Sequence, residues 1–211
     1  MEHKQDAVVT EPVWFESRRK MSLGLMLPVR EQSMGGATPS FEDLVEIAQA
    51  ARRVGFEAIW FADHFTMGDG DDMVGAWEAW TMMAALAARV PEVQVGPMVS
   101  CAGFRNPGVV AKMAEAIDEI SGGRFILGLG AGWNAVEYRQ FGFPFDHRAS
   151  RFEEAVRIIR PLLREGTATY AGTFYQANDA VNRPRGPRPA GAPLLIGSNG
   201  KRLLRTVARH A

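Results

Sequence analysis

Residues 124–134 read RFILGLGAGWN, and this stretch decides which parallel α/β fold the chain adopts. An apolar block leads into three glycines spaced two apart, Gly128, Gly130 and Gly132. A glycine-rich turn after a strand is typical of phosphate binding. The spacing is G-x-G-x-G rather than G-x-G-x-x-G, and the stretch falls on the fourth predicted strand, so a dinucleotide fingerprint is not met. Glycines within a strand indicate instead a close approach of the backbone or a bend in a barrel strand.

Apolar strand-like blocks alternate with amphipathic helix-like blocks on both sides of this stretch. The predicted strands are 23–29, 57–65, 93–101, 124–132 and 193–197, and the predicted helices are 41–54, 75–89, 106–120, 150–165 and 201–211. Such alternation predicts a parallel sheet, either an open doubly wound sheet or a closed eight-stranded barrel. Residues 166–192, with the run NRPRGPRPAGAP, are predicted to be irregular, either as a surface excursion or as a flap over the substrate mouth.

The composition of the chain argues against several classes of binding partner and indicates a cellular compartment. The 24 basic and 24 acidic residues leave no basic excess for nucleic acid or an anionic membrane. The apolar runs are shorter than the roughly 20 residues that a membrane span needs. A single cysteine excludes an internal disulfide framework and fits the reducing cytoplasm. Residues 1–20 lack an apolar signal region, so we expect an N-terminal extension followed by one domain over 21–211 in a cytoplasmic protein.

The strand at 57–65 ends in the pair Asp63 and His64. In parallel α/β proteins functional groups lie at the C-terminal ends of strands. A histidine is the natural proton donor or acceptor near neutral pH, and a carboxylate can anchor a cofactor or substrate. The alternative is a capped strand end with a solvated histidine. Position alone supports both interpretations equally, so His64 and Asp63 are candidate catalytic residues at this point.

The segment IGSNGKR, 196–202, carries a short strand through Gly197, Ser198, Asn199 and Gly200 into a helix. Backbone N–H groups at such a turn bind phosphate with the help of the helix dipole. The spacing of a P-loop is absent, and an ordinary strand–helix turn is the alternative. We predict a phosphate-binding turn here.

Other candidates follow from position. Ser100 and Cys101 end the third predicted strand among small residues that leave room for a large ligand, and Asn134 offers a neutral amide to a flat heterocycle. Cys101 is expected to be a buried small side chain rather than a nucleophile, because nothing pairs it with a base. No His, Cys and carboxylate spacing indicates a metal, and no G-x-S-x-G elbow is present, so metalloenzyme and hydrolase interpretations are poor.

Four segments carry a family resemblance: FADHF, GPMVSCAGFRNP, ISGGRFILGLGAGWNAVEYRQFGFPF and PLLIGSNGKR. Taken in order, they resemble the bacterial luciferase-like family of flavin- or deazaflavin-dependent oxidoreductases from about Met21 to the end. The segment 121–145 is the most specific. It looks most like the subgroup assigned to the deazaflavin coenzyme F420, and the Asp-His pair at 63 and 64 fits that subgroup better than the Glu-His pair of the luciferase subunits does.

The resemblance implies a (β/α)8 TIM barrel with the cofactor ring at its C-terminal mouth. It makes His64 the active-site histidine and Asp63 its neighbouring carboxylate. It places a bulge, often with a non-prolyl cis peptide, near Ser100 and Cys101 to support the ring. It makes Asn134 a ring contact and residues 197–200 the phosphate-binding turn.

The implied reaction is F420-dependent hydride transfer to or from a small organic substrate, with His64 exchanging the accompanying proton. One alternative is a monooxygenase that uses reduced FMN and inserts one oxygen atom from O2. The chain supplies about five β/α units where the barrel has eight, so we expect a C-terminally truncated barrel, and an inactive fragment or cofactor-binding remnant is a further alternative. Related barrels commonly dimerise, which makes a homodimer possible. A nucleotide-binding open sheet is disfavoured because the first strand–helix turn lacks the glycine fingerprint.

Overall fold

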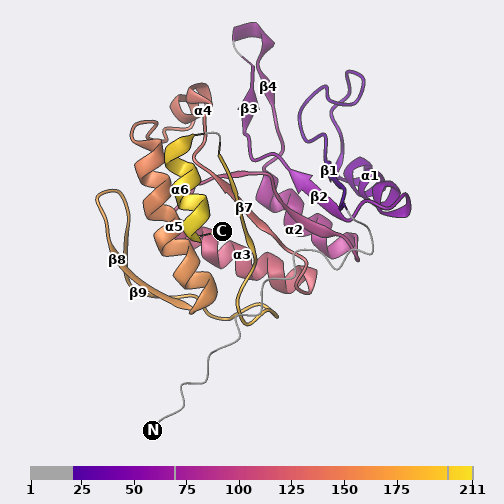
Figure 1. Ribbon diagram of the computed structural model, residues 1–211. Coiled ribbons are helices and arrows are strands. Elements are labelled where there is room, and N and C mark those ends of the chain that lie inside the picture. Colours follow the sequence, from indigo (N-terminus) through magenta and orange to yellow (C-terminus); the bar gives the residue numbers. More distant parts are fainter. Residues whose placement is uncertain (1–20, 69, 199, 211) are drawn as a thin grey trace.

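Five parallel strand positions form the centre of the computed structural model, which describes residues 21–68, 70–198 and 200–210 (Figure 1). The order is β1 (Gly24–Met26), β2 (Ala58–Phe61), β5 (Gln94–Pro97) continued by β6 (Ser100–Cys101), β7 (Leu127–Gly130) and β10 (Leu194–Gly197). All pairings between these strands are parallel, and a bridge from Val95 to Phe125 joins the two halves across the third position. Strand order follows chain order, as in the wall of a barrel. The predicted parallel α/β fold is confirmed.

Helices cover the outer side of this wall in chain order. They are α1 (Phe41–Arg53), α2 (Ala79–Arg89), α3 (Pro107–Ser121), α5 (Arg148–Arg164) and α6 (Lys201–His210), and each packs against the next. Local signals explain their ends. Ser40 and Asp43 form a reciprocal capping box before α1, and Asn106 caps α3 ahead of Pro107. Gly122 ends α3 in the left-handed conformation at φ +65°.

The main core lies between the strands and these helices, with fully buried Phe61, Trp80 and Phe125 among its largest side chains. The inner side of the wall holds a much smaller cluster of Ala58, Trp60 and Ile126, with Leu195 packed against it. Helices therefore cover the outer face of the strands, while small clusters and glycines occupy the inner face.

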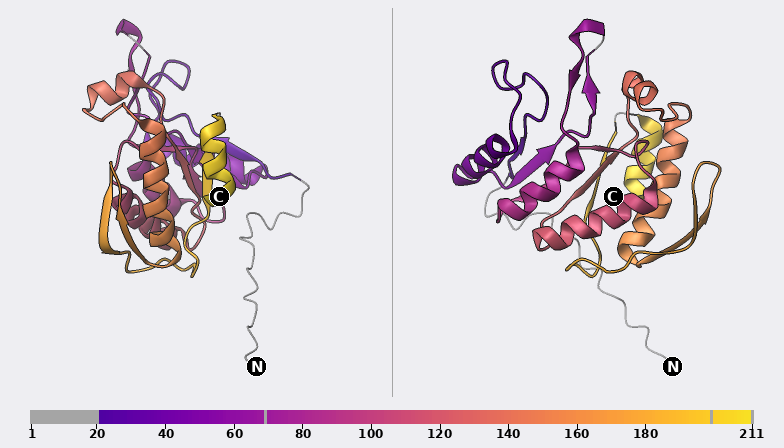
Figure 2. Two further views of the ribbon diagram at one scale, coloured as in Figure 1. Left: turned by 60° about the vertical axis from the view of Figure 1, so that its left-hand side comes forward. Right: turned by 180° about the vertical axis from the view of Figure 1, so that it is seen from behind.

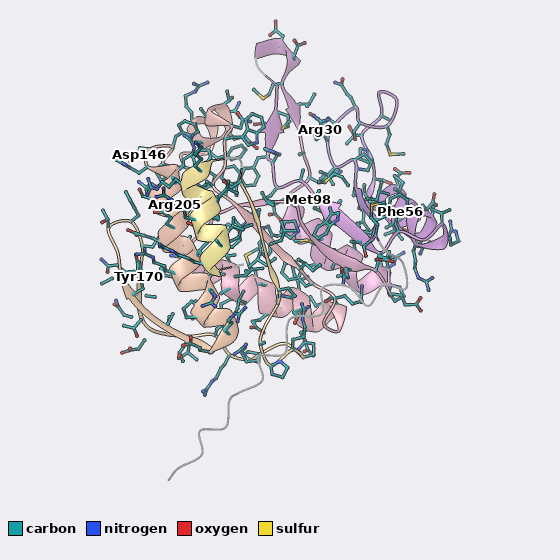
Figure 3. All side chains as sticks on the ribbon, viewed as in Figure 1. Arg30, Phe56, Met98, Asp146, Tyr170 and Arg205 are labelled. Atoms are coloured by element: carbon teal, nitrogen blue, oxygen red, sulfur yellow. The ribbon has the colours of Figure 1, made fainter. Side chains whose placement is uncertain are left out.

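The segment 166–192 was predicted to be irregular, and this is wrong for its first half. β8 (Thr167–Ala171) and β9 (Gln176–Val181) form an antiparallel hairpin. The carboxylate of Glu154 on α5 accepts three backbone N–H bonds from the hairpin turn, from residues 173, 174 and 175. Figure 3 shows Tyr170 on this hairpin at the outer edge, far from Met98 at the centre. The segment is a surface excursion, as one of the two predicted alternatives has it.

Two further elements were not predicted, and both project from the end of the wall where β2 and β7 finish (Figures 1 and 2). One is the hairpin of β3 (Thr66–Met67) and β4 (Val74–Gly75), which flanks a short 3-10 turn, η1 (Gly70–Asp72). The other is the short helix α4 (Ala135–Gln140). Within the described part of the chain, no helix combines the length and apolar character needed to cross a membrane.

Candidate active site

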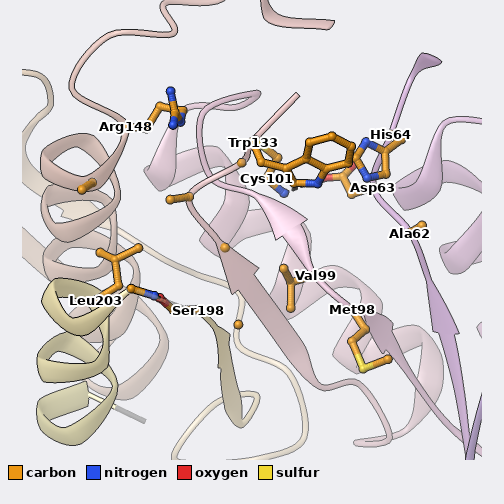
Figure 4. A pocket seen from close by; sticks show the side chains of 16 residues that line it. Ala62, Asp63, His64, Met98, Val99, Cys101, Trp133, Arg148, Ser198 and Leu203 are labelled. Atoms are coloured by element: carbon orange, nitrogen blue, oxygen red, sulfur yellow. Dashed lines mark hydrogen bonds between the residues drawn. The ribbon is translucent and has the colours of Figure 1, made fainter. Parts of the chain in front are cut away.

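A pocket of about 570 Å³ opens at the C-terminal ends of the strands (Figure 4). This volume lies in the roughly 300–1,000 Å³ range of small-molecule and cofactor sites. The lining residues come from the ends of β2, β5 and β6, β7 and β10, and from the first turns of α5 and α6: Ala62, Asp63, His64, Met98, Val99, Cys101, Gly130, Ala131, Gly132, Trp133, Arg148, Ala149, Gly197, Ser198, Gly200 and Leu203. This is the position at which α/β barrels hold their active sites.

The third strand position is interrupted by a non-prolyl cis peptide between Met98 and Val99. A bulge with a cis peptide was predicted near Ser100 and Cys101, and the structure places the cis peptide two residues earlier, in the break between β5 and β6 that we call the Met98–Val99 bulge. Val99 packs into the space left by two glycines, because a Cβ on Gly130 would lie 2.6 Å from one of its methyl groups and a Cβ on Gly197 would lie 3.0 Å from another.

A Cβ on Gly128 would lie 2.0 Å from the carbonyl oxygen of Pro97. Gly128 thus allows a close approach of backbone to backbone, one of the two predicted alternatives, whereas Gly130 makes room for the Val99 side chain and Gly132 for Tyr138 and Cys101.

Asp63 is buried, and both of its carboxylate oxygens accept hydrogen bonds. Oδ2 accepts from the Ser100 hydroxyl at 2.7 Å, from the Cys101 backbone N–H at 3.0 Å and from Arg105 at 2.7 Å, while Oδ1 accepts from Arg105 at 3.1 Å. Arg105 also pairs with Glu78 at 2.5 Å. Burial alone lowers the pKa of Arg105, but the two carboxylates outweigh it and raise this pKa. Asp63 therefore holds the end of the bulged strand in place.

The two candidates on the third strand lie in different surroundings. Ser100 is buried outside the pocket, where its hydroxyl accepts from the Trp80 indole N–H at 3.1 Å and donates to Asp63. Cys101 lines the pocket with its Sγ 3.0 Å from the Tyr138 hydroxyl oxygen. Burial raises the pKa of the Cys101 thiol to about 11, so the sulfur is protonated at neutral pH and a weak nucleophile.

His64 lies on the pocket wall and pairs with a carboxylate that sequence reasoning missed. Its Nδ1 is 2.8 Å from Oε2 of Glu137, which is fully buried on α4. Oε1 of Glu137 accepts the backbone N–H groups of Phe65 at 2.6 Å and Thr66 at 3.1 Å. The spacing from Asn134 to Glu137 matches a helix start with an acidic residue three positions on, which is the signal that was overlooked.

Asn134 occupies a structural position rather than the pocket wall. Its Oδ1 accepts the Val136 backbone N–H as the cap of α4, and its Nδ2 donates to the Thr66 carbonyl at 3.3 Å. The neighbouring Trp133 lines the pocket instead, with its indole edge-on to the His64 ring at a centroid distance of 5.6 Å.

The other end of the pocket is formed by two helix starts. Three residues of the predicted phosphate-binding turn, Gly197, Ser198 and Gly200, line the pocket ahead of α6, and the fourth, Asn199, lies outside the described residues. Arg148 and Ala149, the first residues of α5, also line the pocket. Figure 4 shows Arg148 on the side of the pocket away from His64.

Arg148 was not predicted. Its guanidinium lies 3.8 Å from the centre of the Phe145 ring, and its Nη1 donates to the Phe145 carbonyl. The residue that precedes α5, His147, makes no side-chain capping bond to the helix. Helix N-termini and a guanidinium at one end of a pocket favour an anionic group there.

Over residues 21–68, 70–198 and 200–210, no group of three or more His, Cys, Asp or Glu side chains is arranged to hold a metal ion. The pocket has His64 at one end and Arg148 with the two helix starts at the other.

Comparison with known proteins gives the family. Residues 21–211 match the family model described as luciferase-like monooxygenase. An F420-dependent glucose-6-phosphate dehydrogenase from Amycolatopsis mediterranei is 35% identical over 170 residues, which are 75% of this chain and 50% of that protein. The pyrimidine monooxygenase RutA of Allorhizobium ampelinum is 32% identical over 182 residues, which are 82% of this chain and 48% of that protein.

Among solved structures, the EDTA monooxygenase EmoA from Chelativorans sp. BNC1 superposes with a TM-score of 0.77 at 18% identity, over 92% of this chain and 52% of that one. This likeness agrees with the predicted fold, a TIM barrel of which the chain supplies about five β/α units. The chain spans about half the length of the curated relatives that it matches. By the match over residues 21–211, it belongs to the luciferase-like monooxygenase family.

Proposed function

We propose that the pocket binds coenzyme F420 and that the protein transfers a hydride to or from a small organic substrate. One observation carries the proposal. A single pocket joins His64 and the Met98–Val99 bulge at one end to Arg148 and the starts of α5 and α6 at the other. A phosphorylated cofactor with a flat ring needs these two chemically different ends. The 35% identity to a protein named as an F420-dependent dehydrogenase supports this choice of cofactor.

The pocket residues fit such a group. Ser198, Arg148 and the backbone N–H groups at the helix starts supply donors for a phosphate. Val99, Gly130 and Gly132 form a wall with little side-chain bulk, on which a flat ring can lie. When bound, F420 supplies the hydride chemistry.

The chain's own residues do the rest. His64 exchanges a proton with the substrate, because its ring lines the pocket beside the Trp133 indole. Asp63 is hydrogen-bonded to Arg105 and to the backbone of the third strand. In this proposal it therefore positions the bulge and does not exchange protons.

A second candidate is an FMN-dependent monooxygenase that acts on a small organic substrate. The 32% identity to the pyrimidine monooxygenase favours it, because this similarity covers a larger share of the chain than the similarity to the F420-dependent dehydrogenase does. The same phosphate-binding end of the pocket suits FMN, so the two candidates differ in the ring that the bulge supports.

A fluorescence titration of the 211-residue chain with F420 and with FMN separates the candidates. Saturable quenching of F420 at micromolar protein, with no response to FMN, supports the first proposal. Saturable FMN binding without F420 binding replaces it with the second. Failure of both cofactors to bind contradicts the assignment of the pocket.

A further inference from the structure

The contact between His64 and Glu137 restricts where the imidazole hydrogen sits. Glu137 is 0% exposed, and its carboxylate accepts two backbone N–H bonds at Oε1. These donors have no alternative orientation, so Oε1 acts only as an acceptor. Oε2 faces His64 Nδ1 at 2.8 Å, a normal length for a charge-assisted hydrogen bond.

An ionised carboxylate has no donor of its own, so a hydrogen bond between Oε2 and the ring requires the hydrogen on Nδ1. A neutral imidazole has one donor nitrogen and one acceptor nitrogen, and the hydrogen bond at one nitrogen sets the state of the other. The bond to Glu137 thus places the hydrogen on Nδ1 and leaves the lone pair on Nε2. No residue in the described part of the chain hydrogen-bonds to Nε2, and the ring lines the pocket.

The neighbouring carboxylate does not compete for this ring. Asp63 is the adjacent residue, but its two oxygens are held by Arg105, the Ser100 hydroxyl and the Cys101 backbone. The pair predicted as catalytic from sequence therefore divides. Asp63 hydrogen-bonds to the third strand, whereas His64 pairs with Glu137 on α4, 73 residues further along the chain.

We infer that Glu137 is a positioning residue that fixes His64 as the Nδ1–H tautomer, so that Nε2 is the nitrogen that exchanges a proton with the substrate. The identity of the exchanging partner rests on the proposed function, whereas the tautomer does not. In the oxidation direction Nε2 accepts the proton that leaves the substrate as the hydride leaves to the redox acceptor. The carboxylate of Glu137 then stabilises the imidazolium, and in the reverse direction Nε2 returns the same proton.

The substitution Glu137→Gln tests this inference by inverting the tautomer. The amide keeps its carbonyl oxygen toward the Phe65 and Thr66 N–H groups, because the reverse orientation would set its NH2 group against two donors. The NH2 group then faces His64 and donates to Nδ1. In the variant we expect Nδ1 without a hydrogen and Nε2 with one.

The measurement is a long-range ¹H–¹⁵N correlation spectrum of the cofactor-free 211-residue chain at pH 9, above the ordinary histidine pKa of about 6.5. The chain has four histidines, and His64→Gln identifies the His64 signals by their loss. Glu42→Gln, at an exposed pair with Arg89, is the matched control and should leave these signals unchanged. A protonated Nδ1 in the wild type that becomes unprotonated in Glu137→Gln supports the inference. An unprotonated Nδ1 in the wild type, or the same tautomer in both proteins, overturns it.

A second readout links the tautomer to catalysis. In the protein loaded with its cofactor, Glu137→Gln should leave the cofactor Kd within about 2-fold and should lower kcat by at least about 100-fold. In another enzyme, forcing the wrong histidine tautomer costs about 10⁴-fold. Equal losses in cofactor binding and in kcat would indicate a structural role for Glu137 only. If no cofactor binds, the proposed function is wrong. The spectrum of the cofactor-free chain still tests the tautomer of His64, because that measurement does not depend on the cofactor.

Discussion

Replacing Asp63 with asparagine tests whether the bulged strand is held by a buried ion pair. The Asp63 side chain is 1% exposed and that of Arg105 is 12% exposed. Breaking a buried pair of this kind costs about 3–5 kcal/mol, because the remaining charge is left without compensation. Glu78 stays beside Arg105 at 2.5 Å and compensates part of that charge. We therefore expect the lower end of the range, a loss of about 3 kcal/mol in the free energy of unfolding.

Urea unfolding followed by circular dichroism measures this loss, with an unchanged slope showing that the unfolded state is the same. For a domain of this size about 3 kcal/mol corresponds to a fall in Tm of roughly 6–12 °C. Glu42→Gln, which breaks an exposed ion pair, should stay within about 0.5 kcal/mol of the wild type. A loss below about 1 kcal/mol for Asp63→Asn would refute the reasoning, because the pair would then behave like a surface contact.

Three further predictions concern the pocket wall. The raised pKa of about 11 keeps the Cys101 thiol protonated, so a thiol reagent at pH 8 should label the folded chain about 100-fold more slowly than the urea-unfolded chain. Folding raises this pKa from 9.0, so the protonated thiol stabilises the fold below about pH 9, and this stabilisation is lost as the pH rises toward 11. The urea midpoint should therefore be lower at pH 10.5 than at pH 8. Gly130→Ala should lower the free energy of unfolding by about 1–3 kcal/mol through overpacking, whereas Gly200→Ala, whose Cβ meets nothing within 4 Å, should change it by less than about 0.5 kcal/mol. Arg148→Gln should raise the cofactor Kd about 10-fold in a calorimetric titration through loss of a charged donor, and Arg53→Gln, at the exposed end of α1, should not.

Each of these predictions has a contradicting outcome. Equal labelling rates for Cys101 in the folded and unfolded chain would show that the thiol is not buried. Equal stability of the two glycine variants would remove the close approach of the third strand to Gly130. An Arg148→Gln variant that binds cofactor like Arg53→Gln would place the anion elsewhere.

The fold was predictable because its signals are local. The five strands and the helices α1, α2, α3, α5 and α6 follow from apolar periodicity and from caps such as Ser40 and Asn106, which act within one turn. The hairpin of β8 and β9 was missed because its alternation is weak. Its support comes from Glu154, and the pairing of that carboxylate with the turn N–H groups is a contact that periodicity does not encode.

The sequence predicted where the residues of the candidate site lie better than it predicted what each side chain does. His64, Cys101 and the turn at 197–200 end predicted strands, and parallel strands bring their ends together at one mouth. The roles depend on partners distant in sequence, such as Glu137 for His64 and Arg105 for Asp63. Asp63 looked catalytic because a carboxylate beside a histidine is typical of active sites, yet its hydrogen bonds are those of a strand anchor.

A crystal structure of the chain grown with F420 tests the central claim most directly. The account predicts the deazaflavin ring against the Met98–Val99 bulge with one edge toward His64, and the phosphate between Arg148 and the start of α6. Density for the cofactor at any other place, or a phosphate far from Arg148, would contradict the assignment of the pocket.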